Sequence, residues 1–346
     1  MLAFHAGVSV AVVAFVVAAG AVAYLASCRG TLRWLDEPNA RSMHERPVPR
    51  TGGLGILAGL AAGWTTAAMW ISLPREWAWV LAALLVLAAV SMLDDRRGVP
   101  VMPRLTVHAL VAMALIGAGL GLEELALPWK AWGLTPAWGS VLVILLTIWM
   151  LNLYNFMDGM DGLAGGMALI GFSTMSLLGF MGGDPAFGLA ALTVAAAAGG
   201  FLVFNLPPAR IFMGDTGAAV LGFLAAASVL WAERTDLFPL WAGLLLFSPF
   251  IVDATGTLVA RILARERFWE AHRNHVYQIL ARSRWGSRRT LKVEYAAMLL
   301  ASASVVIALR WDSVELQTFV LSAWLLIYGI ICAVFWGFAA RNEGIP

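Results

Sequence analysis

Five polar stretches interrupt an otherwise very apolar chain, and they hold most of the residues that could take part in chemistry. They are residues 36–53, 93–100, 152–163, 204–217 and 261–278. Each combines Asp or Asn with Arg, His or Gly. Packing of apolar helices does not require such groups, whereas an enzyme that handles a polyanionic substrate at a membrane surface does. The sequence therefore points to an enzyme.

Asp94 and Asp95 are adjacent carboxylates at the expected end of an apolar helix. Neighbouring carboxylates repel each other unless a cation or a proton relieves the repulsion. A solvated helix end beside Arg96 and Arg97 would explain the pair equally well, so the pair alone does not define a site. We treat both aspartates as candidate catalytic residues, and Asp94 also as a candidate metal ligand.

Four amide and carboxyl side chains follow at intervals of three residues: Asn152, Asn155, Asp158 and Asp161. In a helical stretch this spacing brings them near one face. Their oxygens suit Mg²⁺, which keeps water ligands and bridges substrate phosphates, and Mn²⁺ could replace it. A calcium loop of the EF-hand type is excluded because its final Glu is missing. We expect catalytic roles for the two aspartates and substrate binding by the two asparagines.

Asp215 lies in the sequence FMGDTG (212–217), which follows Pro207-Pro208 and opens an apolar helix. Helix N-termini attract anions. Asp215 could be a simple helix cap, and this role is compatible with that of a metal ligand. A metal ion that Asp215 holds over a substrate phosphate would use both features, so we predict that Asp215 binds the metal.

His272 and His275 lie in the most basic polar stretch. Their spacing puts both imidazoles on one side of a helical turn. Zinc would need more soft ligands than this chain offers. We therefore expect the two histidines to bind a substrate diphosphate through hydrogen bonds. The arginines nearby carry less weight, because cytoplasmic loops of membrane proteins are generally basic.

The elements that position these residues must be transmembrane helices. The 346-residue chain is 61% hydrophobic and 13% charged, too apolar to maintain a water-soluble surface. A span needs about 20 apolar residues. Eleven segments qualify: 3–27, 53–73, 76–93, 105–121, 137–154, 163–182, 186–204, 217–232, 237–260, 294–310 and 316–339. We expect an all-α polytopic membrane protein with about eleven transmembrane helices, and one domain over residues 1–346, because the polar stretches are too short for a soluble domain.

The basic residues predict the orientation of the chain. Of the 23 Lys and Arg residues, 19 lie on the side of the expected helices that also carries the polar stretches. Cytoplasmic loops carry the excess of positive charge. The N-terminus is therefore expected outside, and the C-terminus and the active site in the cytoplasm.

These motifs together resemble the polyprenyl-phosphate N-acetylhexosamine-1-phosphate transferase family, which includes the phospho-N-acetylmuramoyl-pentapeptide translocase and the enzymes that initiate O-antigen synthesis. The resemblance runs from about Asp36 to Gln278. It covers the paired-aspartate motif at 94–95, NxxNxxDGxDGL at 152–163, FMGDxG at 212–217 and the histidine loop at 272–275. An early DxPxxRxxH pattern adds Asp36, Arg41 and His44 as substrate-binding residues, and Asp253 falls where relatives carry a PxxD motif.

The resemblance implies a reaction. An N-acetylhexosamine-1-phosphate passes from a UDP-sugar to undecaprenyl phosphate, with Mg²⁺, to give undecaprenyl-diphospho-sugar and UMP. This would be the first membrane step of O-antigen or related glycan synthesis at the bacterial inner membrane. UDP-N-acetylglucosamine, or a donor carrying N-acetylfucosamine or N-acetylquinovosamine, would be the substrate. The partners would be this donor, undecaprenyl phosphate, the bilayer and a second copy of the chain in a homodimer, but no nucleic acid.

This chain departs from the family pattern beside the paired aspartates. Arg104 and His108 stand where many relatives have Lys and Gln, and Ala218 replaces a common Ser. Arg keeps the charge of Lys but not its compact geometry. We still expect Arg104 to bind substrate, although the details of substrate binding near it could differ from those of the relatives.

The chemistry can be compared with alternatives. A phosphate monoester is mostly dianionic near neutral pH, so the repulsion between two polyanions is the larger barrier and a metal ion would reduce it. We expect direct in-line attack by the lipid phosphate, which Asp94 or Asp95 would orient or deprotonate; a two-step path through an aspartyl-phosphate is the alternative. A transporter is the alternative function, but transporters usually place charges near the membrane midplane between repeats. The pattern of CDP-alcohol phosphotransferases does not match residues 158–166.

Overall fold

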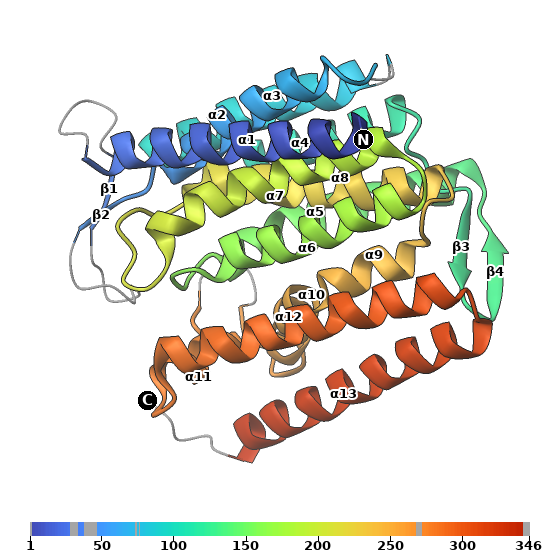
Figure 1. The fold of residues 1–346 in the computed structure, drawn as a ribbon. Coiled ribbons are helices and arrows are strands. Elements are labelled where there is room, and N and C mark those ends of the chain that lie inside the picture. The colour runs from blue at the N-terminus through green and yellow to red at the C-terminus, as the bar shows by residue number, and fades with distance from the viewer. Residues whose placement is uncertain are drawn as a thin grey trace.

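The computed structural model describes residues 2–27, 34–37, 47–72, 75, 77–267 and 272–341. These residues form helices and two short antiparallel hairpins (Figure 1). The helices are α1 (Leu2–Ser27), α2 (Gly52–Ala67), α3 (Trp77–Arg97), α4 (Val101–Gly117), α5 (Pro136–Met157), α6 (Leu163–Met181), α7 (Pro185–Asn205), α8 (Gly214–Arg234), α9 (Leu240–Leu246), α10 (Ser248–Leu263), α11 (Val276–Arg282), α12 (Gly286–Trp311) and α13 (Val314–Arg341). Strand β1 (Leu35–Asp36) pairs with β2 (Val48–Pro49), and β3 (Glu124–Leu127) pairs with β4 (Lys130–Gly133).

The fold is an all-α polytopic membrane fold, as the composition predicts. Within the described residues, eight helices are long and apolar enough to cross a membrane, or nine if α9 and α10 count as one span with a bend of 83°. All eleven expected segments contain helix, but the count of eleven is not confirmed. The segments at 53–73 and 105–121 form helices of only 16 and 17 residues, α2 and α4.

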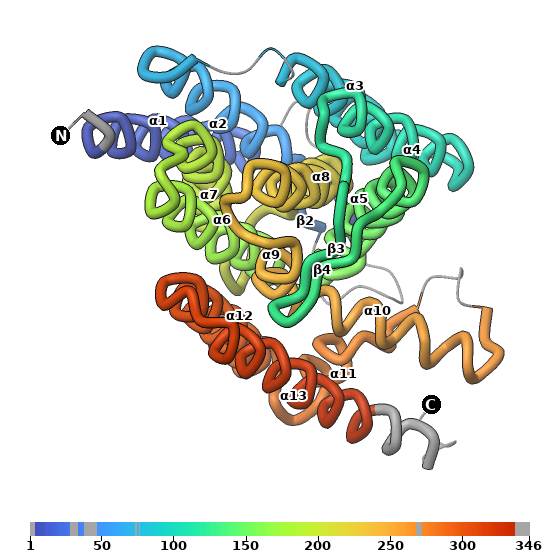
Figure 2. The backbone as a smooth tube through the Cα atoms, turned by 90° about the vertical axis from the view of Figure 1, so that its right-hand side faces the viewer, coloured from blue at the N-terminus to red at the C-terminus, as the bar shows by residue number. Residues whose placement is uncertain are grey.

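Helix α8 lies at the centre of the bundle. It packs against α2, α3, α5, α7 and α9, and it is the most buried of the candidate spans, whereas α13 is the most exposed. Figure 2, which looks along the helices, shows α8 near the middle and α13 at the edge. The central position of α8 matters because this helix starts with the FMGDTG sequence.

Small residues let several helices approach closely. A Cβ added at Gly59 of α2 would lie 2.8 Å from the carbonyl oxygen of Ala14 in α1, and one at Gly200 of α7 would lie 2.5 Å from that of Phe15. Such contacts are the usual basis of helix association in lipid, where apolar burial alone gives little driving force. The resulting α1–α2–α7 packing holds the start of α2 against the start of α8.

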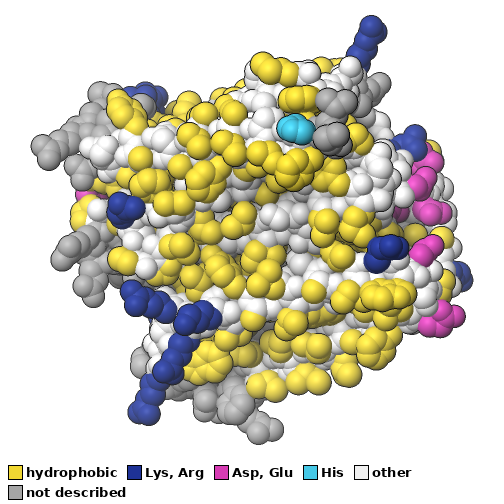
Figure 3. All heavy atoms as spheres, viewed as in Figure 1, with side chains coloured by type: hydrophobic (Ala, Val, Ile, Leu, Met, Phe, Trp, Pro, Cys, Tyr) yellow, Lys and Arg dark blue, Asp and Glu magenta, His cyan; other side chains and the backbone are white. Residues whose placement is uncertain are grey.

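The two ends of the bundle differ in charge. Hairpin β1–β2 and helix α11 lie at one end, and hairpin β3–β4 lies at the other (Figure 1). On the face in Figure 3, hydrophobic side chains cover the middle, Lys and Arg gather near the α11 end, and most Asp and Glu lie at the other end. The N- and C-termini lie toward opposite ends (Figure 1). This arrangement is that of a membrane protein whose polar motifs meet at its basic end.

Candidate active site

Asp95 connects the end of α3 to the start of α8. Its Oδ1 accepts a hydrogen bond from the backbone N–H of Asp215 at 2.8 Å, and its Oδ2 accepts bonds from the N–H and hydroxyl of Thr216 at 2.9 and 2.6 Å. The side chain is 2% exposed. The first N–H groups of a helix have no partner within the helix, and here a residue from another helix supplies the acceptor. These contacts favour a positioning role for Asp95 over proton transfer.

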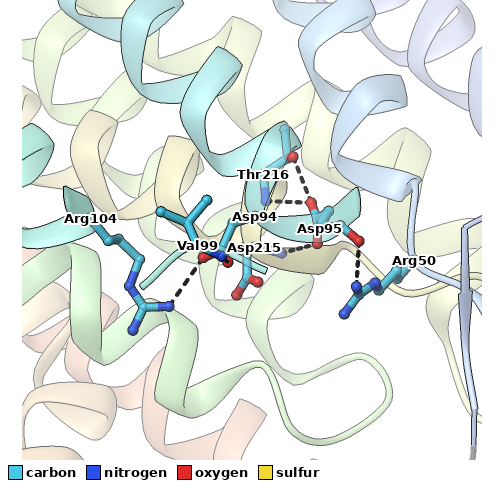
Figure 4. A network of polar contacts seen from close by, with 7 residues as sticks. All are labelled: Arg50, Asp94, Asp95, Val99, Arg104, Asp215 and Thr216. Atoms are coloured by element: carbon cyan, nitrogen blue, oxygen red, sulfur yellow. Dashed lines mark hydrogen bonds and ion pairs between the residues drawn. The ribbon is translucent and has the colours of Figure 1, made fainter. Parts of the chain in front are cut away.

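Asp94 turns toward α4 instead. Its Oδ1 accepts the backbone N–H of Val99 at 2.6 Å, and its Oδ2 forms an ion pair with Nη1 of Arg104 at 3.2 Å. In Figure 4 the carboxylates of Asp94, Asp95 and Asp215 lie close together, with Arg104 on one side and Arg50 on the other. Because protein donors occupy both oxygens of Asp94, this residue is less available to a metal ion than the sequence suggested.

The glycines at 52 and 53 brace the FMGDTG loop. The N–H groups of Gly52 and Gly53 donate to the carbonyl oxygens of Phe212 and Met213, both at 2.9 Å. A Cβ at Gly53 would lie 2.4 Å from the nitrogen of Gly217, so no larger residue fits there. The conformation of the loop therefore depends on the start of α2.

Arg50 adds a polar contact to this brace. Its Nη2 donates a hydrogen bond to the backbone carbonyl oxygen of Asp95 (Figure 4). The contact joins the segment before α2 to the last turn of α3, so that α2, α3 and α8 meet at one point. Residues 49–53, which contain Arg50 and the two glycines, are thus a structural element of the site.

Asp158 follows the last residue of α5 and lies among other carboxylates. Burial raises its pKa well above the usual value, and the negative charges of Asp215, Asp95 and Asp161 raise it further. The side chain of Asn155, one turn earlier, donates a hydrogen bond to the Asp215 carboxylate. The third and fourth polar stretches, at 152–163 and 204–217, are therefore in direct contact.

Asn205 and Asp161 hold the two loops of the site together. Oδ1 of Asn205 accepts the N–H of Gly162, and its Nδ2 donates to the carbonyl of Ile211, both at 2.9 Å. Oδ2 of Asp161 accepts the N–H of Ala209 at 2.9 Å. Asn205 was not among the residues predicted from the sequence. The only feature that could have indicated it is a lone amide at the end of an apolar helix, just before the Pro207-Pro208 pair.

The histidine loop docks onto the Asp158 loop through Tyr277. The Tyr277 hydroxyl donates to the carbonyl oxygen of Phe156 at 3.0 Å, and a Cβ at Gly159 would lie 2.2 Å from that hydroxyl. The rings of His272 and His275 are 4.8 Å apart. The histidine loop thus packs against the Asp158 loop, although more than a hundred residues separate the two in the sequence.

His272 is half-buried and neutral near pH 7. Its pKa is lowered to about 4, chiefly by burial and also by the neighbouring charges of His275 and Arg261, while Asp253 acts in the opposite direction. A neutral imidazole donates one hydrogen bond and accepts another. An anion beside this ring would favour the charged form.

Four further residues were predicted to bind substrate. Two of them lie outside this cluster, and two lie outside the described residues. Asn152 donates to the carbonyl oxygen of Ile148 in its own helix at 2.7 Å. Asp36 lies in β1 opposite Val48, in the hairpin that leads to Gly52. Arg41 and His44 lie outside the described residues. The roles predicted for these four residues stay predictions.

The acidic cluster has the donor set of a magnesium site. Asp158 and Asp215 are partly buried, and no described Lys or Arg forms an ion pair with either of them. Among the described residues, no group of three or more His, Cys, Asp and Glu side chains is arranged so that it could hold a metal ion by itself. Mg²⁺ does not need such a group, since it typically binds one or two carboxylates together with water and substrate phosphates. The residues present therefore fit this ion.

Comparisons with known proteins agree with the motifs. The sequence model of the family described as glycosyl transferase family 4 matches residues 77–233, from the start of α3 to the end of α8. A Bacillus subtilis protein named "probable undecaprenyl-phosphate N-acetylglucosaminyl 1-phosphate transferase" is 27% identical, over 87% of this chain and 84% of its own length. The undecaprenyl-phosphate alpha-N-acetylglucosaminyl 1-phosphate transferase of Yersinia pestis is 28% identical, over 79% and 76%. The decaprenyl-phosphate N-acetylglucosaminephosphotransferase of Mycobacterium tuberculosis is also 28% identical, over 84% and 78%.

Proposed function

We propose that the chain is a member of glycosyl transferase family 4, whose model matches residues 77–233, and that it transfers an N-acetylhexosamine-1-phosphate from a UDP-sugar to a polyprenyl phosphate. The products are a polyprenyl-diphospho-sugar and UMP. The names of the three relatives support a polyprenyl-phosphate acceptor and an N-acetylglucosaminyl donor. We propose undecaprenyl phosphate as the acceptor, UDP-N-acetylglucosamine as the first donor to test, and a role at the start of cell-surface glycan synthesis.

One observation carries the proposal: Asp158 and Asp215 lie close enough for their charges to interact, which raises the pKa of Asp158, and the histidine loop packs against the Asp158 loop through Tyr277. Ionising carboxyl groups in such a place is costly unless a cation compensates them. A complex of a divalent cation with a diphosphate would compensate the carboxylates through the metal and place the phosphates near the imidazoles. A transporter would not need carboxylates and histidines in this combination. Transporters usually place their charges near the membrane midplane, whereas the polar side chains here lie at one end of the bundle.

We propose Mg²⁺ as the cofactor. Asp215, Asp158 and the side-chain oxygen of Asn155 would hold it. When bound, Mg²⁺ neutralises charge on the diphosphate and acts as a Lewis acid. Asp95 keeps the start of α8 in position, so that Asp215 projects toward Asn155.

Other residues of the chain bind and orient the two substrates. Arg104, which Asp94 orients, attracts the phosphate of the acceptor lipid. This phosphate is mostly dianionic near neutral pH and needs little help from a base. His272 donates a hydrogen bond to the diphosphate or to the leaving UMP, and His275 accepts one from a hydroxyl or N–H group of the donor sugar or nucleotide. The acceptor oxygen then attacks the phosphorus that carries the sugar, in line with the departing UMP.

The test is an assay of UMP release by the purified protein with UDP-N-acetylhexosamines, undecaprenyl phosphate and Mg²⁺. We expect release that depends on both the lipid and the metal. Asp215→Asn should reduce turnover by about 100-fold or more, as loss of a key electrostatic group does. The matched control is Asp236→Asn, an exposed residue at the other end of the bundle with a φ of 54° that Asn also tolerates. Lipid-independent release, or an Asp215→Asn enzyme with normal turnover, would refute the proposal.

The one-step mechanism has its own test. The protein is incubated with a UDP-sugar labelled in the sugar-linked phosphate and without acceptor lipid. Direct attack leaves the protein unlabelled. A labelled protein would establish the two-step path through an aspartyl-phosphate instead.

A further inference from the structure

Asp253 of α10 is a buried carboxylate with four hydrogen-bond donors. Its Oδ1 lies 2.9 Å from the backbone N–H of Val276, 3.3 Å from Nδ1 of His275 and 3.2 Å from the hydroxyl of Thr257. Its Oδ2 accepts the N–H of Tyr277 at 3.0 Å. The side chain is 7% exposed. Three of these donors belong to the histidine loop and α11, so Asp253 fixes where this segment lies.

The ring of His275 is held on its faces as well. It stacks on Phe156 with centroids 6.0 Å apart and an interplanar angle of 27°, and on Tyr277 at 6.0 Å and 20°. The residue is 4% exposed. These contacts leave the ring little rotational freedom, and they place it against the last turn of α5, next to Asp158.

A hydrogen bond at one imidazole nitrogen determines what the other nitrogen can do. If Nδ1 of His275 donates to Asp253, Nε2 is on the opposite edge of the ring and faces away from α10. The same arrangement, in which a carboxylate orients a histidine, is common behind functional histidines. It fixes both the tautomer and the direction of the free nitrogen.

We propose that Asp253 is a positioning residue of the active site, which holds His275 with Nδ1 protonated, so that Nε2 is free to accept a hydrogen bond from the donor substrate. The proposal rests on the proposed function, since it takes the ligand of His275 to be a UDP-sugar, whose hydroxyl and N–H groups can donate. Asp253 acts only through His275 and α11 and contacts no reacting atom. Asp253 also connects α10 with the Asp158 loop. It accepts the backbone N–H of Tyr277, and the hydroxyl of Tyr277 donates to the carbonyl oxygen of Phe156.

The first test reads the tautomer without turnover. Nitrogen NMR of the ¹⁵N-histidine-labelled protein in nanodiscs should show His275 with a protonated Nδ1; the signal is assigned by its loss in His275→Gln. In Asp253→Asn, the amide can donate to Nδ1, so we expect the proton to move to Nε2. A wild-type His275 with a bare Nδ1, or no change in the variant, would overturn the proposal.

The second test is kinetic. Replacing a residue that orients a functional histidine typically costs 10- to 100-fold, so Asp253→Asn should lower kcat/KM by about that factor, chiefly through a higher KM for the UDP-sugar. Asp253→Glu should recover part of the loss. In a double-mutant cycle with His275→Gln, the two losses should not add, because both variants remove one interaction. Additive losses would mean that Asp253 only stabilises the fold.

Thr257→Val is the matched control. It removes the hydroxyl that donates to Oδ1 of Asp253 at 3.2 Å and leaves the contacts of this carboxylate with His275 and α11 in place. Valine has nearly the shape of threonine, so the packing of α10 is kept. We expect kcat/KM within about twofold of wild type; a loss equal to that of Asp253→Asn would overturn the proposal. If the wild-type protein releases no UMP, the proposed function fails, and the tautomer measurement still decides the role of Asp253.

Discussion

Asp94 and Asp95 are neighbours in the sequence, but their carboxylates serve different helices. Successive residues of a helix point in directions about 100° apart, so Asp95 faces α8 while Asp94 faces Arg104. The repulsion expected from an adjacent pair is relieved in two separate ways: by N–H and hydroxyl donors for one carboxylate, and by an ion pair for the other. Asp158 and Asp215 form no ion pair with a described Lys or Arg, and they are the carboxylates that we propose as Mg²⁺ ligands.

Asp95→Asn should destabilise the protein. An amide in this position would turn its NH₂ group toward the N–H of Asp215 or Thr216, and leaving a buried donor unpaired costs about 1–3 kcal/mol. The measurement is the thermal unfolding midpoint in detergent without substrate. Thr216→Val is the milder control, since it removes only the hydroxyl donor. Equal stability of Asp95→Asn and wild type would contradict a positioning role for Asp95.

His272 makes substrate binding sensitive to pH. Its pKa lies at about 4, below the usual value of 6.5, so it is neutral above about pH 5 when no ligand is bound. A diphosphate nearby favours the charged form and raises this pKa. UDP binding between about pH 4 and 6.5 should therefore take up protons and become tighter as the pH falls.

Calorimetry of UDP binding at pH 6 in two buffers of different ionisation enthalpy measures this uptake. Several carboxylates in the cluster also titrate, so His272→Gln serves as the reference. The proton uptake of the wild type should exceed that of the variant. The same uptake in both proteins would show that His272 does not respond to the ligand.

At the scale of elements, the site is a meeting of helix ends that small residues allow. The start of α2 contacts the start of α8 through Gly53 and Gly217, and the segment before α2 reaches the last turn of α3 through Arg50. Side chains on these two glycines would separate the backbones. The glycines of the motifs therefore determine how close the acidic side chains can come to each other.

Gly53→Ala tests the brace. The new methyl group would lie 2.4 Å from the backbone nitrogen of Gly217, and backbone cannot move aside as a flexible side chain can. We expect a loss of about 1–3 kcal/mol in unfolding free energy, typical of overpacking, together with reduced turnover. Gly117→Ala in α4 meets nothing within 4 Å, and it should leave both properties close to wild type. A stable, fully active Gly53→Ala protein would argue against the brace.

At the scale of the whole molecule, the polar motifs share one end of a bundle whose middle is apolar (Figures 1 and 3). The alternation of helix directions brings the ends of α3, α5 and α7 together with the starts of α2, α4, α6 and α8. The excess of Arg at this end predicts that it faces the cytoplasm. The nucleotide sugar and the lipid phosphate would then meet at the inner leaflet.

Cysteine labelling checks this orientation. In a variant without native cysteines, Ser283→Cys lies in the turn between α11 and α12, and Thr235→Cys lies at the other end of the bundle. Both positions are exposed. A maleimide that does not cross membranes should label Thr235→Cys, but not Ser283→Cys, in intact cells. The reverse pattern would place the site outside.

The part of the site that the sequence could predict was the set of residue types. Asp158, Asp215 and the histidines stood out because charged and amide groups are rare in such an apolar chain. The contribution of Tyr277 was not visible in the sequence, since a tyrosine near a membrane surface is common and only its contact with Phe156 gives it a role. Asn205 was missed for a similar reason: its partners lie in two different loops.

The sequence by itself determined that the protein lies in a lipid bilayer and that its segments are helical. Apolar segments of the length of a bilayer specify helices that span it, because no other open segment satisfies its backbone hydrogen bonds in lipid. The positions of the acidic groups at helix ends followed from the same pattern. Spacing along the chain could not, however, distinguish a carboxylate that binds metal from one that holds the fold.

Only the tertiary structure showed which carboxylates have protein donors. Asp95 reaches donors 120 residues away, and Asp253 reaches donors 23 and 24 residues away on another helix. Asp158 instead lies among other carboxylates, which raise its pKa. The difference arises from which helices pack together, and local sequence does not encode it.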